Sequence, residues 1–266
     1  MKKAVAIFLF SAALCSCGTV DSHKTNKVQT YIVDSDRYTT GFTDDYIQTT
    51  QTTYQYDENS FMEGRNIMLD VPFISQDNYP TGCELVSTSM LLAYYGLDIS
   101  INELIMNYVE LHDLYINDAG MLCGYDLDEY FIGNPYDSNG YGCHSGVIQK
   151  ALLKYLPSEE YKVHNLRGTP LEEICRSYID YGVPVLIWAS IDMKPTFRTE
   201  NNSWLIEETG EYYTWTSNEH CLVLVGYDDL NYYFNDPLNN KNTAYEKSLV
   251  SLRYGELDMQ AIAISR

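Results

Sequence analysis

A cysteine at the predicted start of a helix is the residue best placed to act as a nucleophile. Cys83 follows Pro80, Thr81 and Gly82 and precedes an uninterrupted helical pattern over residues 84–95. The positive end of a helix dipole and a neighbouring imidazolium both lower the pKa of a thiol and so favour the reactive thiolate. By its position in the chain, Cys83 has the first of these two features.

Three further residues could complete this chemistry. His220 begins a predicted strand and Asp236 ends the next one, so antiparallel pairing would bring the imidazole and the carboxylate together. Gln76 precedes Cys83 closely enough for its amide to form an oxyanion hole with the Cys83 backbone N–H. Asn235 competes with Asp236 for the role of orienting the imidazole, and strand alternation places the two on opposite faces. The pattern predicts amide hydrolysis through an acyl-enzyme.

These residues need a fold that places the start of a helix beside a sheet. The first helical pattern closes at Gly96, and a capping box at Ser100 and Glu103 starts a second helix that we expect to reach residue 112. Helices are also predicted over residues 146–156, 169–182 and 245–254, and residues 113–144 are expected to be a long irregular segment. Strands are predicted over residues 183–191, 204–207, 211–215, 220–226, 232–234 and 259–264. This order predicts an α+β fold with a mostly antiparallel sheet.

The charge balance argues against nucleic acid as a partner. The chain of 266 residues has 37 acidic and 17 basic side chains and a net charge of -20, whereas phosphate backbones are held by clustered Lys and Arg. Hydrophobic residues make up 45% of the chain and charged residues 20%, so the chain can bury a sizeable core. We expect one domain with a tail, acting as a monomer.

The N-terminus has the pattern of an export signal. Two lysines follow Met1, and residues 4–14 form an apolar stretch that is too short to span a bilayer. The sequence that ends in Ser16 and Cys17 resembles a bacterial lipobox, which implies cleavage after Ser16 and lipidation of Cys17. Cleavage at a nearby ordinary signal site, or an uncleaved anchor, is the alternative. A diacylated cysteine would hold the protein on the outer surface of the cell membrane.

The expected domain boundaries follow from this interpretation. Residues 1–16 are the signal peptide, and residues 17–64 are a lipidated cysteine with a polar tether rich in Thr and Tyr. Residues 65–266 are the globular domain, which has the usual size of a single domain. The protein is therefore expected to be lipid-anchored outside the cytoplasm, or secreted.

Five segments together resemble the C39-like peptidase family of bacteria, within the papain-like cysteine peptidase superfamily. They are residues 71–76, 80–84, 91–96, 219–227 and 235–237. The resemblance implies a papain-like fold with Cys83 as nucleophile, His220 as general base and acid, Asp236 as orienting residue and Gln76 in the oxyanion hole. Members that process bacteriocins sit on an ATP-driven transporter, and this sequence has no G-x-x-x-x-G-K-[ST] motif. Removal of leader peptides during export is therefore not expected.

The remaining cysteines are interpreted as structural. Cys143 and His144 are adjacent and so face apart, Cys175 lies inside an amphipathic helix, and Cys221 is expected to face away from His220. A disulfide between Cys123 and Cys143 remains open.

No cofactor and no metal site is predicted. The sequence has neither an H-E-x-x-H motif nor paired C-x-x-C motifs. The acidic group Asp126, Asp128 and Glu129 lacks the oxygen spacing of a calcium loop, so a solvated face is the preferred interpretation.

Three functions fit these features. The first is a tethered cysteine peptidase or amidase acting on a peptide or an amide. The second transfers the acyl group to an amine, as a transglutaminase does, because the same triad serves both reactions. The third is a surface binding lipoprotein without turnover, with Trp204 and Trp215 in a recognition cleft.

Overall fold

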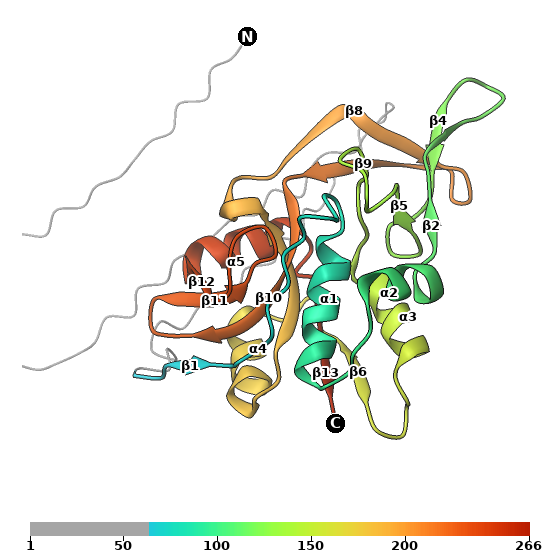
Figure 1. The fold of residues 1–266 in the computed structure, drawn as a ribbon. Coiled ribbons are helices and arrows are strands. Elements are labelled where there is room, and N and C mark those ends of the chain that lie inside the picture. The colour runs from blue at the N-terminus through green and yellow to red at the C-terminus, as the bar shows by residue number, and fades with distance from the viewer. Residues whose placement is uncertain (1–63) are drawn as a thin grey trace, which may run out of the picture. The chain divides into compact units, whose positions relative to one another are not determined.

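An antiparallel sheet organises residues 64–266, the part of the chain that the computed structural model describes (Figure 1). Its strand order is β12-β11-β10-β7-β13-β6, and β1 also pairs with β10. All of these pairings are antiparallel, as the sequence predicted. The strands are β1 (Ile67–Met68), β6 (Lys162–Asn165), β7 (Val185–Ser190), β10 (Glu219–Tyr227), β11 (Asn231–Asn235), β12 (Thr243–Glu246) and β13 (Ala261–Ser265).

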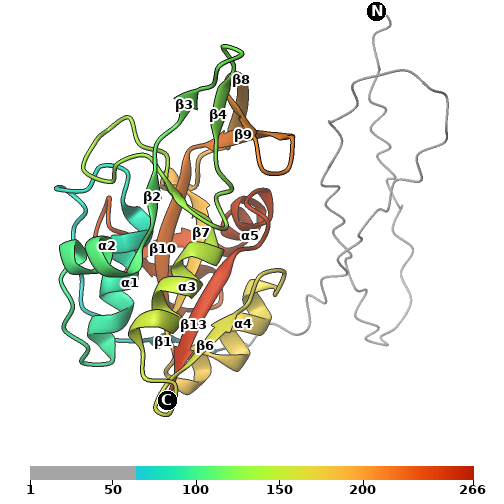
Figure 2. The same cartoon turned by 90° about the vertical axis from the view of Figure 1, so that its right-hand side faces the viewer.

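Helices cover both faces of this sheet. On one face lie α1 (Cys83–Tyr94), α2 (Ile101–Tyr108) and α3 (Ser145–Tyr155), and on the other lie α4 (Leu171–Ser177) and α5 (Lys247–Glu256). Figure 2 shows α3 in front of the sheet and α4 beside β6. The strand β7 is apolar up to Ala189 because alternate residues face the two layers: Leu186 and Trp188 pack with α1, whereas Val185 and Ile187 pack with α4 and α5. Each such buried side chain stabilises the fold by roughly 1.5–3 kcal/mol.

The first two helices begin where the sequence predicted them. Cys83 is the first residue of α1, and the Ser100 hydroxyl accepts the Glu103 N–H at 3.1 Å to cap α2. The expected end of the second helix at residue 112 is wrong. Instead, β2 (Leu111–His112) pairs with β5 (Phe131–Ile132), so tertiary pairing replaces the last helical turn.

The predicted helix over residues 169–182 is shorter than expected. Pro170 stands before α4 as its N-cap rather than as its first helical residue, and a separate 3-10 turn, η2 (Ile179–Tyr181), follows. Gly182 ends this segment with a left-handed φ of 78°, a conformation that glycine adopts without strain. A second 3-10 turn, η3 (Ile191–Met193), follows β7.

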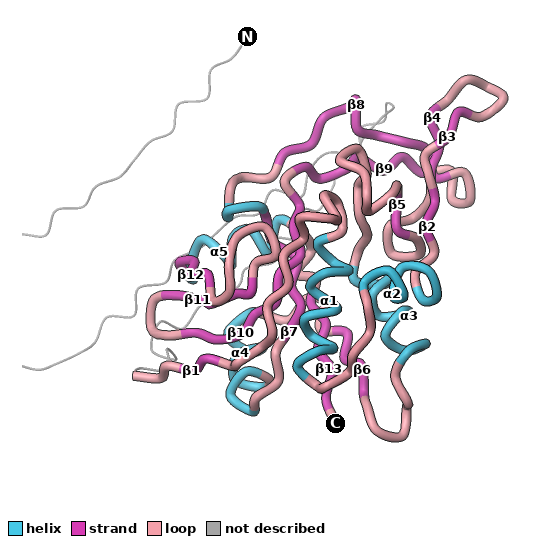
Figure 3. Tube along the Cα trace, viewed as in Figure 1, coloured by secondary structure: helices cyan, strands magenta, loops and turns pink. Residues whose placement is uncertain are grey.

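A second sheet has the order β3-β4-β8-β9, and the strand colours of Figure 3 show it extending away from the main sheet. It is built from β3 (Tyr115–Ile116), β4 (Leu122–Gly124), β8 (Phe197–Ile206) and β9 (Glu211–Ser217). The predicted hairpin is therefore correct, but the segment predicted to be irregular contributes two of its strands. The Trp204 side chain is fully buried in the small core beneath this sheet, and its indole N–H donates to Tyr125 O at 3.2 Å.

The signal peptide, the lipidation of Cys17 and the tether were predicted for residues that lie outside the described part of the chain. Within residues 64–266, no helix combines the length and the apolar character that crossing a membrane requires.

Candidate active site

The Cys83 sulfur lies against the open edge of β10. The strand β11 pairs with β10 only as far as Asn235 opposite Val223, so among residues 64–266 no strand pairs with the next part of β10 on this side. There the Cys221 N–H donates to Cys83 Sγ at 3.4 Å, and the Ser87 hydroxyl donates to Cys221 O at 2.9 Å. The first turns of α1 thus take the place of a neighbouring strand.

Next to this contact, His220 is paired with Asp236. The His220 Nε2 lies 2.8 Å from Asp236 Oδ1, and both side chains are buried. Asp236 follows the end of β11, as strand pairing predicted, and it is Asp236 rather than Asn235 that contacts the imidazole. The Asn235 amide instead donates to Val71 O and Pro72 O, at 3.0 and 3.2 Å.

Further donors hold the Asp236 carboxylate. Its Oδ2 accepts hydrogen bonds from Asn239 Nδ2 at 2.9 Å and from the Tyr245 hydroxyl at 2.7 Å. Burial opposes the charged form of Asp236, but the hydrogen bond and charge of His220, together with these two donors, outweigh it and lower the Asp236 pKa to about 2. Asn239 and Tyr245 were not predicted, and only the position of Asn239 three residues after Asp236 could have indicated one of them.

Gln76 lies in the segment before α1 and is 3% exposed. Its backbone N–H donates to Pro237 O at 3.1 Å, which joins it to the chain that carries Asp236. Its side-chain Nε2 donates to Pro80 O at 3.3 Å and to Tyr79 O at 3.5 Å. The Gln76 Oε1 is buried and has no hydrogen-bond partner within residues 64–266.

The thiol itself is turned toward a carboxylate. Cys83 Sγ donates to Glu84 Oε2 at 3.3 Å, and in the described part of the chain no hydrogen bond joins Cys83 to His220. The Glu84 Oε1 accepts the Cys143 N–H at 2.6 Å. Glycine at position 142 permits this contact, because a Cβ there would lie 2.4 Å from Glu84 Oε1.

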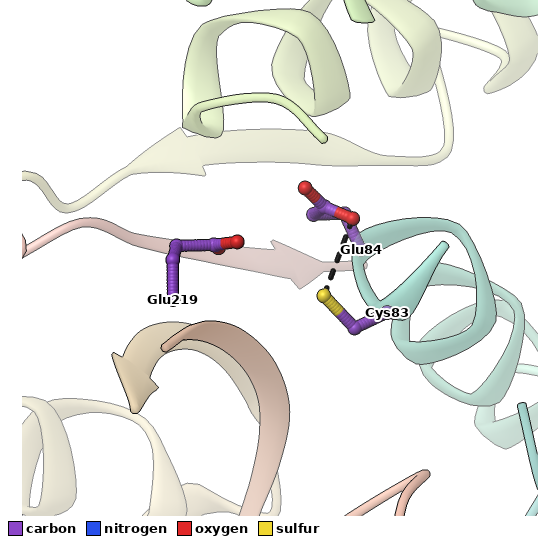
Figure 4. A group of neighbouring side chains, drawn as sticks. All are labelled: Cys83, Glu84 and Glu219. Carbon is purple, nitrogen blue, oxygen red and sulfur yellow. Dashed lines mark hydrogen bonds between the residues drawn. The ribbon is translucent and has the colours of Figure 1, made fainter. Parts of the chain in front are cut away.

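A second carboxylate completes this group of side chains. Ligand atoms of Cys83, Glu84 and Glu219 all lie within 4.8 Å of one another, and all three residues are buried. Figure 4 shows the Glu219 carboxylate pointing from its strand toward the other two side chains. Sequence reasoning missed both glutamates. Strand alternation contained the signal, because it places Glu219 on the opposite face from His220 and on the same face as Cys221.

The electrostatics of the thiol differ from the expectation. The start of a helix was expected to lower the Cys83 pKa, but burial and the charges of Glu84 and Glu219 raise it well above its ordinary value, with a smaller opposing contribution from the Cys221 N–H. Burial also raises the Glu84 pKa to about 7, against the hydrogen bonds that it accepts. Burial and the Glu84 charge raise the Glu219 pKa well above its ordinary value.

The other cysteines of the described residues have buried, free thiols, so the structure contains no disulfide between Cys123 and Cys143. Cys175 packs in the core beneath α4, as predicted. Cys143 is also in the core, and its carbonyl accepts the Trp188 indole N–H at 3.0 Å. His144 faces away from it and lies 3.3 Å from Asp128 Oδ2.

Two members of the acidic group after β4, Asp128 and Glu129, form ion pairs with basic side chains of the protein. Asp128 binds Arg167 with both carboxylate oxygens, at 3.1 and 3.0 Å, and Glu129 pairs with Lys150. Trp204, expected in a recognition cleft, is fully buried, so that expectation is wrong for this residue. Trp215 is half-buried and packs against Tyr141.

A family model and a solved structure indicate the same family for this chain. The family described as "Peptidase_C39 like family" matches residues 68–262. The uncharacterized protein YvpB of Bacillus subtilis (strain 168) is 27% identical over 213 residues, which cover 77% of this chain and 78% of YvpB. The crystal structure of a protein assigned as a C39-like peptidase from Bacillus anthracis superposes with a TM-score of 0.65 at 30% identity. It covers 76% of this chain and 98% of that one.

Proposed function

Because the chain belongs to the C39-like peptidase family, we propose that it is a cysteine peptidase or amidase that hydrolyses a peptide or amide bond. One observation carries the proposal. The Cys83 sulfur accepts the backbone N–H of Cys221 on β10. His220, the residue before Cys221, is paired with Asp236. This arrangement supports Cys83 as the nucleophile, His220 as the base and Asp236 as the residue that orients the base.

In the proposed reaction, Cys83 Sγ turns from Glu84 toward His220. Asp236 binds Nε2 of the imidazole, which leaves Nδ1 to take the thiol proton. The thiolate forms a bond to the substrate carbonyl carbon, and the Cys83 backbone N–H and the Gln76 amide stabilise the oxyanion. His220 then protonates the leaving amine as the C–N bond breaks, and afterwards it activates the water that hydrolyses the thioester.

To stabilise the oxyanion, the Gln76 side-chain amide must leave its present hydrogen-bond partners. Its Nε2 donates to two backbone carbonyls at 3.3 and 3.5 Å, both long for hydrogen bonds. A substrate oxyanion is a stronger acceptor than either carbonyl, because hydrogen bonds to charged groups are about twice as strong as neutral ones. Binding of the substrate would therefore draw the Gln76 amide toward the carbonyl under attack.

The experiment is hydrolysis of a peptide mixture by the full chain, with new N-termini detected by mass spectrometry. We expect Cys83→Ala to abolish cleavage, whereas Cys175→Ala, which removes a buried thiol in the core on the other face of the sheet from α1, should retain it. Iodoacetamide should alkylate Cys83 faster than Cys175 at neutral pH. Cleavage by Cys83→Ala, or equal alkylation of the two thiols, would refute the peptidase. Crosslinks to an added amine in place of cleavage would identify an acyl transferase.

A binding protein without turnover is the second candidate, and the orientation of the thiol favours it. Cys83 Sγ donates to Glu84, and burial with the two glutamates raises its pKa. On this alternative the thiol stays beside Glu84 when a peptide binds. Saturable peptide binding by both the wild type and Cys83→Ala, with no cleavage and no alkylation of Cys83, would establish it.

We also propose that the protein is exported and anchored through Cys17. The support is the apolar segment followed by the lipobox-like sequence before Cys17. Metabolic labelling with a fatty acid should mark the wild type and Cys15→Ser, but not Cys17→Ser. Loss of label from Cys15→Ser alone would place the lipid on the other cysteine.

A further inference from the structure

The buried side chains of Cys83, Glu84 and Glu219 can each carry a negative charge when deprotonated, and their surroundings offer too little positive charge to balance it. A thiol and two carboxyl groups place their ligand atoms within 4.8 Å of one another. Within residues 64–266, no ion pair with Lys, Arg or His is made by either glutamate. Buried charges in proteins are paired or coordinate metals, because an unpaired buried charge costs several kcal/mol.

Glu219 gives the second, independent observation. The residue is 8% exposed, and its Oε1 has no hydrogen-bond partner in the described part of the chain. Its carboxylate points into the group rather than toward solvent (Figure 4). Glu84 is held differently, because the Cys143 N–H fixes one of its oxygens. One carboxylate is therefore anchored, and the other has an unsatisfied oxygen aimed into the same space.

The two carboxyl groups do not satisfy each other. No hydrogen bond joins Glu84 to Glu219 among residues 64–266, although a shared proton would require one. An ion between the three side chains would satisfy the Glu219 oxygen and balance the negative charge that the three ligands carry once they are deprotonated. The donor set then decides which ion, since thiolate is a soft ligand that Ca²⁺ and Mg²⁺ do not select, whereas Zn²⁺ accepts both thiolate and carboxylate.

We propose that Cys83 Sγ, Glu84 and Glu219 bind one Zn²⁺ or a chemically similar thiophilic divalent cation. Three protein ligands leave the fourth tetrahedral position to water. On binding, the thiol proton and any proton held by the Glu84 and Glu219 carboxyl groups pass to solvent, and the sulfur bonds the ion as thiolate. The ion occupies the position from which Cys83 would react, so metal binding and acyl transfer exclude each other. The site itself does not require Cys83 to be a nucleophile.

Co²⁺ titration of the full chain tests this directly, because cobalt in a zinc site reports its own ligands. Cys15 and Cys17 are changed to Ser in the starting protein, so that these two thiols do not contribute. We expect one Co²⁺ per chain, with a thiolate-to-cobalt charge-transfer band in the near ultraviolet and displacement by Zn²⁺. Cys83→Ser should remove the band. Glu219→Gln, which keeps the shape of the side chain, should weaken binding about tenfold or more.

Cys175→Ser and Glu172→Gln are the matched controls, since each alters the same residue type outside the group, and both should bind Co²⁺ as the starting protein does. Circular dichroism shows which variants are folded. If Glu219→Gln does not fold, Glu219→Asp, which keeps the charge and shortens the reach, replaces it and should also weaken binding. The absence of a charge-transfer band in the starting protein overturns the proposal. So does a band that survives Cys83→Ser, or an affinity unchanged in the folded Glu219 variant.

Discussion

The Tyr245 hydroxyl donates to Asp236 Oδ2 at 2.7 Å, on the carboxylate oxygen opposite the one that binds His220. Tyr245 lies on β12, the edge strand of the sheet, and Asp236 follows the neighbouring strand β11. The edge strand therefore helps to fix the orientation of a buried imidazole two strands away. This relationship connects the stability of the sheet edge to the chemistry proposed for the site.

Tyr245→Phe is expected to lower kcat about tenfold and to leave KM nearly unchanged, because a lost hydrogen bond to a charged group corresponds to about 1.4 kcal/mol or more. The variant removes one donor to Asp236 without opening a cavity. Kinetics on any peptide substrate found by the cleavage experiment measure both constants. Tyr181→Phe, at a residue 79% exposed, is the control and should be unchanged. A rise in KM alone would show that Tyr245 contacts substrate instead.

Asp236→Asn should destabilise the protein by about 2 kcal/mol at pH 7. In the folded wild type, the Asp236 pKa is lowered from 3.8 to about 2. The Asp236 carboxylate therefore stabilises the fold at pH values above its unfolded-state pKa, and this stabilisation is lost as the pH falls toward about 2. The stability difference between wild type and variant should therefore shrink below about pH 4. Urea unfolding at a series of pH values measures it. A difference that stays constant from neutral to acidic pH would contradict the assignment.

Gly142→Ala is expected to destabilise by about 1–3 kcal/mol. The residue has a φ of 133°, and a new Cβ would lie 2.4 Å from Glu84 Oε1, so either the backbone or the Glu84 carboxyl group must move. Thermal unfolding gives the change. Gly255→Ala is the matched control, because Gly255 lies inside α5 and has open space around its Cα. That substitution should leave stability unchanged or raise it by up to about 1 kcal/mol.

Ser87→Ala should cost about 1–3 kcal/mol, because it removes the donor to the buried Cys221 carbonyl. Ser89 offers a close comparison on the same helix. Its hydroxyl donates to Leu85 O within α1, at 3.0 Å, rather than to a carbonyl of β10. Because such back-bonding slightly destabilises helices, Ser89→Ala should be nearly neutral. Equal effects of the two variants in denaturant unfolding would show that Ser87 does not contribute through Cys221.

Local signals predicted the elements that position the site. Gly82 and the helical pattern after it located the start of α1, and alternation placed Asp236 and Asn235 on opposite faces. The catalytic roles of Cys83, His220, Asp236 and Gln76 remain predictions. The predicted length of the second helix was wrong because the pairing of β2 with β5 depends on residues distant in sequence.

The glutamates were missed for a different reason. Charged residues in apolar segments are normally interpreted as solvent-facing, and Glu84 and Glu219 flank the predicted catalytic residues in sequence. Only the packing of α1 on β10 shows that both are buried and close together. The lowered thiol pKa expected for a helix start was wrong because burial, followed by the charges of these two side chains, raises the Cys83 pKa.

The start of α1 takes the place of a neighbouring strand beside β10. The reactivity of the Cys83 thiol should therefore report local unfolding at this contact. The Cys83 sulfur accepts a backbone N–H that a strand would otherwise bind, and the residue is only 6% exposed, so we expect a reagent to reach the thiol more readily when this contact opens. Variants that loosen the contact, such as Ser87→Ala, should then speed alkylation of Cys83 while they lower stability. The alkylation rate therefore measures the opening of one sheet edge in the intact, folded protein.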